Sequence, residues 1–214
     1  NRGIEVNFDN NMDDPKVFKL WQDGNTIGIF QFESQGMTNF MKELKPDCLE
    51  DIIAGVSLYR PGPMDQIPRY IANKKDPEHA VYTHPSLKPI LKVTYGCMVY
   101  QEQVMQIVRD LAGYSLGRAD LVRRAMGKKK LDVMAKEREN FVHGKTDENG
   151  NIEIKGCVRN GIDEESANKI FDEMAEFAKY AFNKSHAACY AVVAYRTAYL
   201  KAYYPAEFMA AMLN

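Results

Sequence analysis

Apolar residues recur at helical spacing along most of the chain, and this pattern predicts a mainly α fold. In the segment EQVMQIVRDLAGY, four apolar residues lie at positions i, i+3, i+4 and i+7 of one helix face: Val104, Ile107, Val108 and Leu111. Gly113 follows them, where a helix ends easily because glycine adopts the left-handed conformation at little cost. We therefore expect an amphipathic helix with its apolar face in a core.

Two more helices are expected directly after this one. Ser115 can cap a helix over LGRADLVRRAM, and Gly127 would end that helix in the left-handed conformation. A further helix begins at LDVMAKERENFVHG. Residues 145–161 then change character, and Asn149-Gly150 between short runs is typical of a two-residue hairpin turn. The sequence thus predicts a surface hairpin or loop.

The helical pattern returns after Gly161. Asp163 is a good N-cap for a helix whose buried stripe consists of Ala167, Ile170, Phe171, Met174, Phe177 and Ala178. Ser185 is expected to cap the next helix, HAACYAVVAYRTAYLKAYY, which stops before Pro205. Apolar residues surround nearly its whole circumference, so we expect it to be central and mostly buried. Pro205 opens a last helix, AEFMAAML.

The first hundred residues are less regular. We expect helices near 15–22, 34–44 and 48–58, and IGIFQF is a possible short strand or buried extended segment. After RPGP, the sequence to Lys92 is rich in proline and charge and is expected to be loop with one short helix.

Composition places the chain among ordinary globular proteins. Of its 214 residues, 45% are hydrophobic and 27% charged, and no apolar run approaches the roughly 18 residues that span a membrane. The opening stretch NRGIEVNFDNNMDDP is polar and acidic, unlike a signal peptide. The four cysteines form no CxxC pair, so we expect buried thiols in a reducing compartment: Cys48, Cys97, Cys157 and Cys189. A cytoplasmic location follows as the expectation.

The overall charge hides an asymmetry. The chain carries a formal net charge of −1, but the segment from Arg118 to Lys130 contains six cationic residues and only one acidic residue. That local charge of +5 leaves −6 for the rest of the chain. A basic surface spread over the whole protein is therefore disfavoured, whereas one focused positive site fits the composition.

The cations in RRAMGKKK have two interpretations. Arg123 and Arg124 are adjacent, so on a helix they point about 100° apart and are not expected to face the same neighbour. Asp120 lies four residues before Arg124 and offers it a surface ion pair worth about 0.3–0.5 kcal/mol. A solvated helix end would explain this, but an anion would relieve the repulsion among the three residues that follow: Lys128, Lys129 and Lys130. Both interpretations stay open from the residues alone.

Two other stretches contain anion-binding groups. In AFNKSHAACYA, a helix N-terminus with free N–H groups would be surrounded by Asn183, Lys184, Ser185 and His186. In SLYRPGPM, a rigid Pro-Gly-Pro turn follows Tyr59 and Arg60, a pair suited to phosphate or base contacts. A capped loop and a simple connection between helices are the plainer alternatives.

Motifs for a complete active site are not found. The sequence has no GxxxxGK[ST] or GxGxxG phosphate loop and no histidine-rich metal motif. Its adjacent acids, Asp13-Asp14 and Glu164-Glu165, lie in a polar stretch and in the first turn of a helix. Neither suits a two-metal centre, which needs carboxylates on a rigid buried element. Anion-binding groups without catalytic acids suggest half of an active site.

Four segments stand out together: GIFQFESQGM (28–37), LYRPGPM (58–64), YGCMVYQEQVMQIVRDLAGYSLGRADLVRRAMGKKK (95–130) and AFNKSHAACYAVVAYRTAYLKAYYPAEFMAAML (181–213). Together they resemble the fingers region of the bacterial replicative DNA polymerase III alpha subunits, the C-family polymerases. They span nearly the whole chain in the family's order. The stretch 149–156 departs from the family as a variable insertion, and the first fifteen residues match loosely.

The resemblance implies one multi-helix fingers domain over residues 1–214, with a minor β-hairpin or short strands. Its parts would be N-terminal helices with the Pro-rich turn (1–92), a basic helical segment (93–144), a variable hairpin or loop (145–161) and C-terminal helices (162–214). Fingers of this family close over the incoming deoxynucleoside triphosphate and the templating base. The palm, whose aspartates bind Mg²⁺, would lie upstream, so we expect no activity from the fragment alone.

The resemblance also assigns roles to the three stretches. Arg123 and Arg124, with the three lysines behind them, would face the triphosphate or the pyrophosphate leaving group. The four residues 183–186 would line the nucleotide pocket, and Tyr59 and Arg60 would buttress it. The implied partners are a DNA primer-template, deoxynucleoside triphosphates and, through regions outside this chain, holoenzyme subunits such as the sliding clamp.

Two other functions remain as alternatives. A helical module that binds the DNA backbone would use the same cations, and its binding would weaken steeply with salt. A partner-docking domain could present the tyrosine stripe Tyr190, Tyr195, Tyr199, Tyr203 and Tyr204. We favour a core role for these tyrosines, because they alternate with alanine and valine on a helix that is apolar almost all round.

Overall fold

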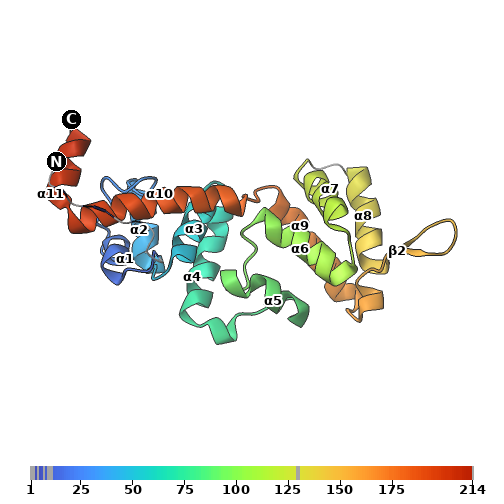
Figure 1. Ribbon diagram of the computed structural model, residues 1–214. Helices are drawn as coiled ribbons and strands as arrows, with labels where there is room; N and C mark the ends of the chain where they lie inside the picture. The colour runs from blue at the N-terminus through green and yellow to red at the C-terminus, as the bar shows by residue number, and fades with distance from the viewer. Residues whose placement is uncertain (1–2, 4, 7, 9–11, 129–130, 214) are drawn as a thin grey trace. The chain divides into compact units, whose positions relative to one another are not determined.

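The computed structural model describes residues 3, 5–6, 8, 12–128 and 131–213. Helices dominate it, as the sequence predicts, and one small antiparallel sheet accompanies them (Figure 1). The chain divides into two compact units, residues 1–59 with 185–214 and residues 60–184. Each unit is described by itself.

The first unit is built from helices at both ends of the chain. Its helices are α1 (Pro15–Gln22), α2 (Gln35–Leu44), α3 (Leu49–Leu58), α10 (Lys184–Tyr203, from Ser185 onward) and α11 (Pro205–Leu213). An aromatic cluster fills its core, where the ring of Phe18 lies 5.7 Å from Tyr195 and that of Trp21 5.6 Å from Phe32. Burying each such side chain stabilises the fold by roughly 1.5–3 kcal/mol.

The second unit holds the remaining elements. Its α-helices are α4 (Ile67–Lys75), α5 (Lys88–Leu91), α6 (Gln101–Ala112), α7 (Leu116–Gly127), α8 (Leu131–His143) and α9 (Glu164–Ala178). Short 3-10 turns cover η1 (Pro63–Gln66), η2 (Pro77–His79), η3 (Pro85–Leu87), η4 (Lys92–Thr94) and η5 (Val158–Asn160). The strands β1 (Lys145–Thr146) and β2 (Ile152–Ile154) pair antiparallel, with Lys145 opposite Ile154.

The core of this unit contains the stripes that the sequence predicts. Val104, Ile107, Val108 and Leu111 of α6 are all buried. The predicted stripe of α9 is buried too, except that Phe177 is only partly so. The helices α6, α7, α8 and α9 lie together in the ribbon (Figure 1) and share this core. Gly113 ends α6 with φ 78°, and the Asp163 side chain caps α9, both as expected.

Several sequence expectations are wrong in detail. IGIFQF is a turn rather than a strand, because Gly28 (φ 79°) and Gln31 (φ 68°) interrupt extended backbone, although Ile29 and Phe32 are buried. Gly127 is the last residue of α7, and the cap is Lys128 with φ −90°. The hairpin forms, but its loop is longer than the expected two residues, because Asp147 Oδ1 accepts the N–H groups of Asn149 and Asn151.

The long helix α10 is buried on one face instead of all round. Its buried residues are Ala187, Ala191, Ala194, Tyr195 and Ala198, a single stripe at helical spacing. Tyr203 is 40% exposed, and its hydroxyl donates to Asp14 Oδ2 at 2.6 Å. Alanine and valine make the helix apolar in sequence, but one face contacts neighbours among the described residues. The core interpretation of the tyrosine stripe therefore fits Tyr195 and is wrong for Tyr203.

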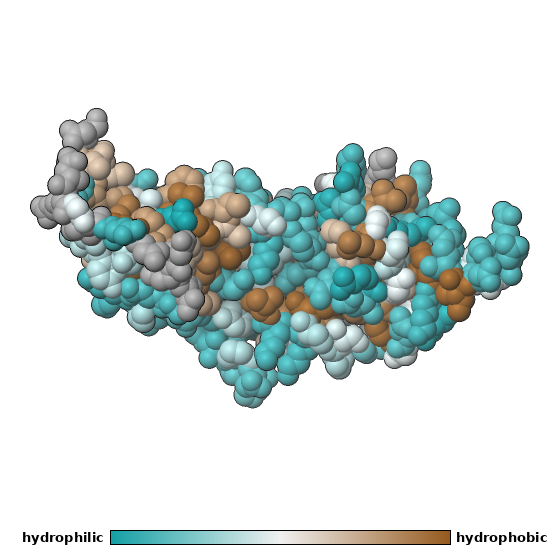
Figure 2. Space-filling model, viewed as in Figure 1, coloured by the Kyte–Doolittle hydropathy of each residue, from teal (hydrophilic) through white to brown (hydrophobic). Residues whose placement is uncertain are grey.

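The visible face in Figure 2 shows apolar residues in separate brown patches among hydrophilic ones. Among the described residues, no helix combines the length and apolarity needed to cross a membrane.

Cys97 and Cys157 are buried free thiols, Cys48 is half-buried, and Cys189 is exposed, so the expectation of four buried thiols is wrong for Cys189.

Candidate anion-binding site

In the basic helix α7, two of the three arginines, Arg123 and Arg124, contact the same carboxylate. Arg123 donates from Nε and Nη2 to Asp120 Oδ1 at 3.0 and 2.7 Å, and Arg124 Nε lies 2.7 Å from Asp120 Oδ2. The expectation that adjacent arginines face different neighbours is thus wrong. Positions i+3 and i+4 both neighbour position i on a helix surface, and the long side chains converge on Asp120.

This arrangement distinguishes the two arginines. Hydrogen bonds from Arg123, together with the charges of both arginines, hold the pKa of Asp120 below its ordinary value. The Arg123 side chain is 20% exposed and fixed on several sides, whereas that of Arg124 is 62% exposed. A pre-oriented guanidinium therefore lies beside a more accessible one, a pair suited to oxygens of an anion.

The first turn of α6 connects Arg123 to the chain before α10. Arg123 Nη1 donates to Gln101 Oε1 at 3.0 Å, and Gln101 Nε2 donates to the Ala181 carbonyl at 3.0 Å. The Gln101 backbone N–H also donates to the Phe182 carbonyl at 2.8 Å. One glutamine thus holds the basic helix and residues 181–182 together.

Glu102 occupies the helix end where the sequence predicts an anion. The Lys184 N–H donates to both oxygens of Glu102, at 3.2 and 3.0 Å, and Asn183 Nδ2 donates to Oε1 at 2.8 Å. The helix α10 begins at Lys184, two residues before the start at His186 that a Ser185 cap implies, so the expectation of a cap at Ser185 is wrong. The Nζ atom of Lys184 lies 5.2 Å from the centre of the Tyr100 ring. A carboxylate at this position is favoured by the helix dipole and by the free N–H groups.

Arg60 supports the same segment. Its Nη2 donates to the Tyr180 carbonyl at 2.7 Å, and its guanidinium lies 4.2 Å from the centre of the Phe182 ring. Burial lowers the pKa of Arg60 from its ordinary value. Gly62 has φ 100°, and a Cβ there would lie 2.5 Å from the Tyr180 ring, so the Pro-Gly-Pro turn packs tightly on this residue.

The other sequence-predicted residues lie elsewhere or outside the description. Lys128 is exposed at the end of α7, while Lys129 and Lys130 lie outside the described residues. In the first unit, the Tyr59 ring stacks on Phe40 at 6.1 Å, Ser185 is exposed, and the His186 ring lies 4.5 Å from that of Tyr190. Within the second unit, the structure connects Arg60, Arg123, Arg124, Asn183 and Lys184 through the first turn of α6.

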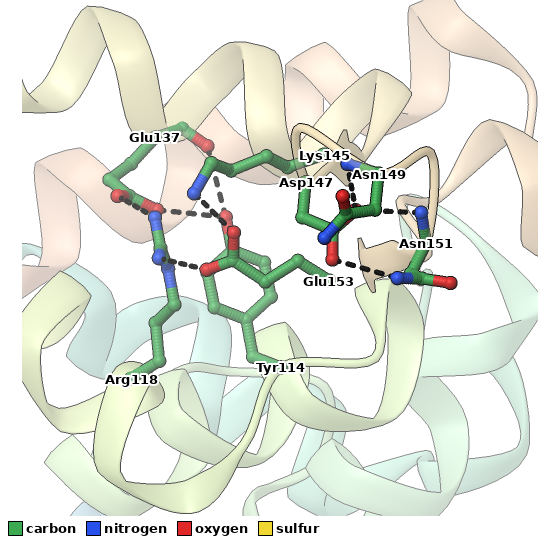
Figure 3. Close-up of polar contacts among 8 residues, drawn as sticks. All are labelled: Tyr114, Arg118, Glu137, Lys145, Asp147, Asn149, Asn151 and Glu153. Atoms are coloured by element: carbon green, nitrogen blue, oxygen red, sulfur yellow. Dashed lines mark hydrogen bonds and ion pairs between the residues drawn. The ribbon is translucent and has the colours of Figure 1, made fainter.

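Arg118, the first cation of the basic segment, belongs to a different network (Figure 3). It donates to Glu137 at 2.8 Å and to Glu153 at 2.9 Å, and the Tyr114 hydroxyl donates to Glu137 Oε2 at 3.0 Å. Lys145 also pairs with Glu153. Burial, with the nearby Glu137 charge, raises the pKa of Tyr114. These contacts connect α7 and α8 to the hairpin, and the Arg118 charge is paired with the carboxylates of Glu137 and Glu153.

Sequence reasoning missed Gln101 and Glu102. Polar residues at the start of an amphipathic helix are common, so YQEQV gives no specific signal. Their partners lie some eighty positions later in the chain, and only the folded arrangement shows that both side chains face residues 181–184.

The metal-ligand chemistry of the described residues does not fit magnesium. One group could hold a metal among them, formed by Asp47, Cys48 and Asp51. Burial, and next the Asp51 charge, raise the pKa of the Cys48 thiol to about 11, so the thiol stays protonated at neutral pH. Magnesium prefers oxygen ligands in octahedral geometry, and a protonated thiol is a poor substitute.

Comparisons with known proteins agree with the resemblance seen in the sequence. The family model for the bacterial DNA polymerase III alpha subunit finger domain matches residues 1–149. The chain is 52% identical to the DNA polymerase III subunit alpha of Thermus aquaticus over all of its own length and 17% of that protein. It is 53% identical to that of Chlamydia trachomatis and 51% identical to that of Rickettsia felis, over 95% and 100% of the chain.

The chain matches only a part of each of these relatives. The chain spans about a sixth of the length of these relatives, 17% for the Thermus aquaticus protein and 15% for the Chlamydia trachomatis protein. Both the family model and the relatives cover the basic helix α7 and the first turn of α6. The chain therefore belongs to the bacterial DNA polymerase III alpha subunit family, as part of its fingers domain.

Proposed function

We propose that this chain binds the triphosphate of an incoming deoxynucleoside triphosphate during template-directed DNA synthesis by a replicative DNA polymerase. The observation that carries the proposal is the double link made by α6. Gln101 contacts Arg123 and residues 181–182, while Glu102 contacts Asn183 and Lys184. The two stretches that the sequence singles out for anion binding are thereby held in one network.

The chemistry of nucleotidyl transfer supports this assignment. Such a reaction leaves the protein mainly the tasks of positioning phosphates and neutralising their charge. Arginine is suited to this because its planar guanidinium binds two oxygens at once. Asp120 carries a single negative charge, so a triphosphate competes with it for Arg123 and Arg124. In this proposal Asp120 orients the arginines until the nucleotide arrives.

The other components of the reaction are proposed from the family. Mg²⁺ would be held by carboxylates of another domain of the polymerase, and the primer-template would be the DNA partner. The sliding clamp and other holoenzyme subunits would bind through regions outside this chain. In the second unit, Arg60 would support the segment that carries the nucleotide contacts, whereas roles for Tyr59, Ser185 and His186, which lie in the first unit, stay predictions from the sequence.

Single-turnover kinetics of the full-length polymerase on a primer-template test the proposal. Arg123→Ala and Arg124→Ala should each lower the ratio of the incorporation rate to the nucleotide Kd by at least tenfold, which corresponds to about 1.4 kcal/mol. Arg159, an exposed arginine of η5 outside the network, gives the matched control Arg159→Ala and should leave this ratio unchanged.

The same variants separate the proposal from DNA-backbone binding. If the arginines contact only DNA, both variants weaken duplex binding and reduce its salt dependence, while the nucleotide Kd stays at the wild-type value. That outcome would refute triphosphate binding by this site.

A further inference from the structure

A cavity in the second unit lies beside the Pro-Gly-Pro turn and takes no part in the proposed function. It encloses about 380 Å³ between η1 and α4, the segment from Tyr82 to Met98, and α9. Small-molecule sites in proteins occupy roughly 300–1,000 Å³, so the space admits a compact ligand.

The lining of the cavity is divided between apolar and acidic groups. Its apolar part consists of Leu87, Leu91, Met98 and Phe177, of which Leu87 and Leu91 are buried. Two tyrosines, Tyr82 and Tyr180, add aromatic rings. A ligand with an apolar or aromatic body would therefore bury its surface here, and aromatic rings also favour a cation beside them.

Acidic side chains outnumber basic ones in the lining. The carboxylates of Asp65, Glu173 and Glu176 face a single guanidinium, that of Arg69, which leaves two negative charges. Arg69 already donates to the Val81 carbonyl at 3.2 Å. Such a lining repels phosphate and attracts a cation.

The three carboxylates differ in how firmly they are held. Glu173 is half-buried on α9, and Thr83 Oγ1 donates to its Oε1 at 2.6 Å. This bond fixes the carboxylate at the cavity wall, and among the described residues no lysine or arginine forms an ion pair with it. Glu176 is exposed and pairs with Lys179, so its charge is partly offset. Glu173 is thus the best-placed partner for a bound cation.

We propose that this cavity binds a small organic cation with an apolar body, of the aromatic amidine or amine class. The apolar body would contact Leu87, Leu91 and Phe177, and the cationic group would pair with Glu173 and be attracted by Asp65. A charge-assisted bond to a fixed carboxylate is stronger and more directional than a neutral one. The neutral analogue of such a ligand loses this bond and keeps only the apolar contact.

Saturation-transfer NMR on the full-length polymerase tests the proposal with two probes of nearly equal shape. Benzamidine carries the cation, and benzamide is its neutral counterpart. We expect benzamidine to bind at least tenfold more tightly than benzamide. Glu173→Gln keeps an oxygen that accepts from Thr83 but removes the charge, and it should weaken benzamidine binding at least tenfold.

Two further variants serve as a control and as a second test of the negative charge in the cavity. Glu165→Gln makes the same change on an exposed residue of α9 that does not line the cavity, and it should leave benzamidine binding unchanged. Asp65→Asn, on an exposed residue of the rim, should weaken it by a smaller factor than Glu173→Gln. Equal binding of the two probes, or benzamidine binding that neither Glu173→Gln nor Asp65→Asn alters, would overturn the proposal.

Discussion

Replacing Glu102 by alanine should loosen the start of α10. The variant removes the acceptor of the Lys184 N–H, which lies 3.0 Å from Oε2, and of the Asn183 side chain, which lies 2.8 Å from Oε1. Loss of a helix cap costs about 1 kcal/mol, and loss of a negative charge at a helix N-terminus costs about 0.3–1 kcal/mol more. The expected local destabilisation is therefore about 1–2 kcal/mol.

Hydrogen–deuterium exchange of the full-length protein measures this effect locally. Because 1.4 kcal/mol is a factor of ten in an equilibrium constant, protection of the amides at 184–187 should fall roughly five- to thirtyfold in Glu102→Ala. Glu102→Gln keeps an acceptor and loses only the charge, so its protection should fall by no more than about fivefold. Glu148→Ala, on an exposed acid of the hairpin loop, is the control. Unchanged protection at 184–187 in Glu102→Ala would show that Glu102 does not cap this helix.

Three further predictions concern the second unit and the cysteines. Tyr114→Phe removes a hydrogen bond to Glu137 and should lower the free energy of unfolding by about 1.5–3 kcal/mol in urea titrations, with a smaller loss pointing to a solvated pair. In NMR titrations the Asp120 carboxyl should have a pKa below its ordinary value of 3.8, and Arg123→Ala should raise the pKa of Asp120. Because the pKa of Asp120 is lower in the folded protein than in the unfolded chain, the ion pair stabilises the fold at neutral pH, and this stabilisation is lost as the pH falls through the folded pKa. An unmoved pKa would exclude the ion pair. Iodoacetamide at pH 8 should modify exposed Cys189 before Cys97 and Cys157, whose pKa values burial raises to about 11 and about 12, and mass spectrometry of the modified peptides would reveal any other order.

Local pattern predicts much of this fold because its helices have clear apolar stripes. Val104, Ile107, Val108 and Leu111 are buried as their spacing indicates, and Asp163 caps its helix. The pattern fails where apolar residues occur on every face of a helix. Alanines and valines lie all around α10, so the sequence does not reveal that only the face with Ala191 and Tyr195 is buried.

The candidate site is less predictable, because its contacts join distant parts of the chain. The pair Asp120–Arg124 follows from spacing, and the structure confirms it. The second contact, from Arg123 to the same carboxylate, depends on side-chain reach rather than on the direction of Cα–Cβ bonds. Contacts of Gln101 and Glu102 with residues 181–184 depend on how the chain places α6 beside those residues, and they have no local signature in the sequence. The assignment of the site residues to nucleotide binding remains a prediction.

Arginine modification under turnover conditions tests the central claim most directly. Phenylglyoxal would be applied to the full-length polymerase on a primer-template with Mg²⁺, with and without the correct deoxynucleoside triphosphate, and each arginine followed by mass spectrometry. Contact with the triphosphate predicts that the nucleotide slows modification of Arg123 and Arg124 at least tenfold while leaving exposed Arg159 unaffected. Equal modification of Arg123 and Arg124 with and without the nucleotide would contradict the claim.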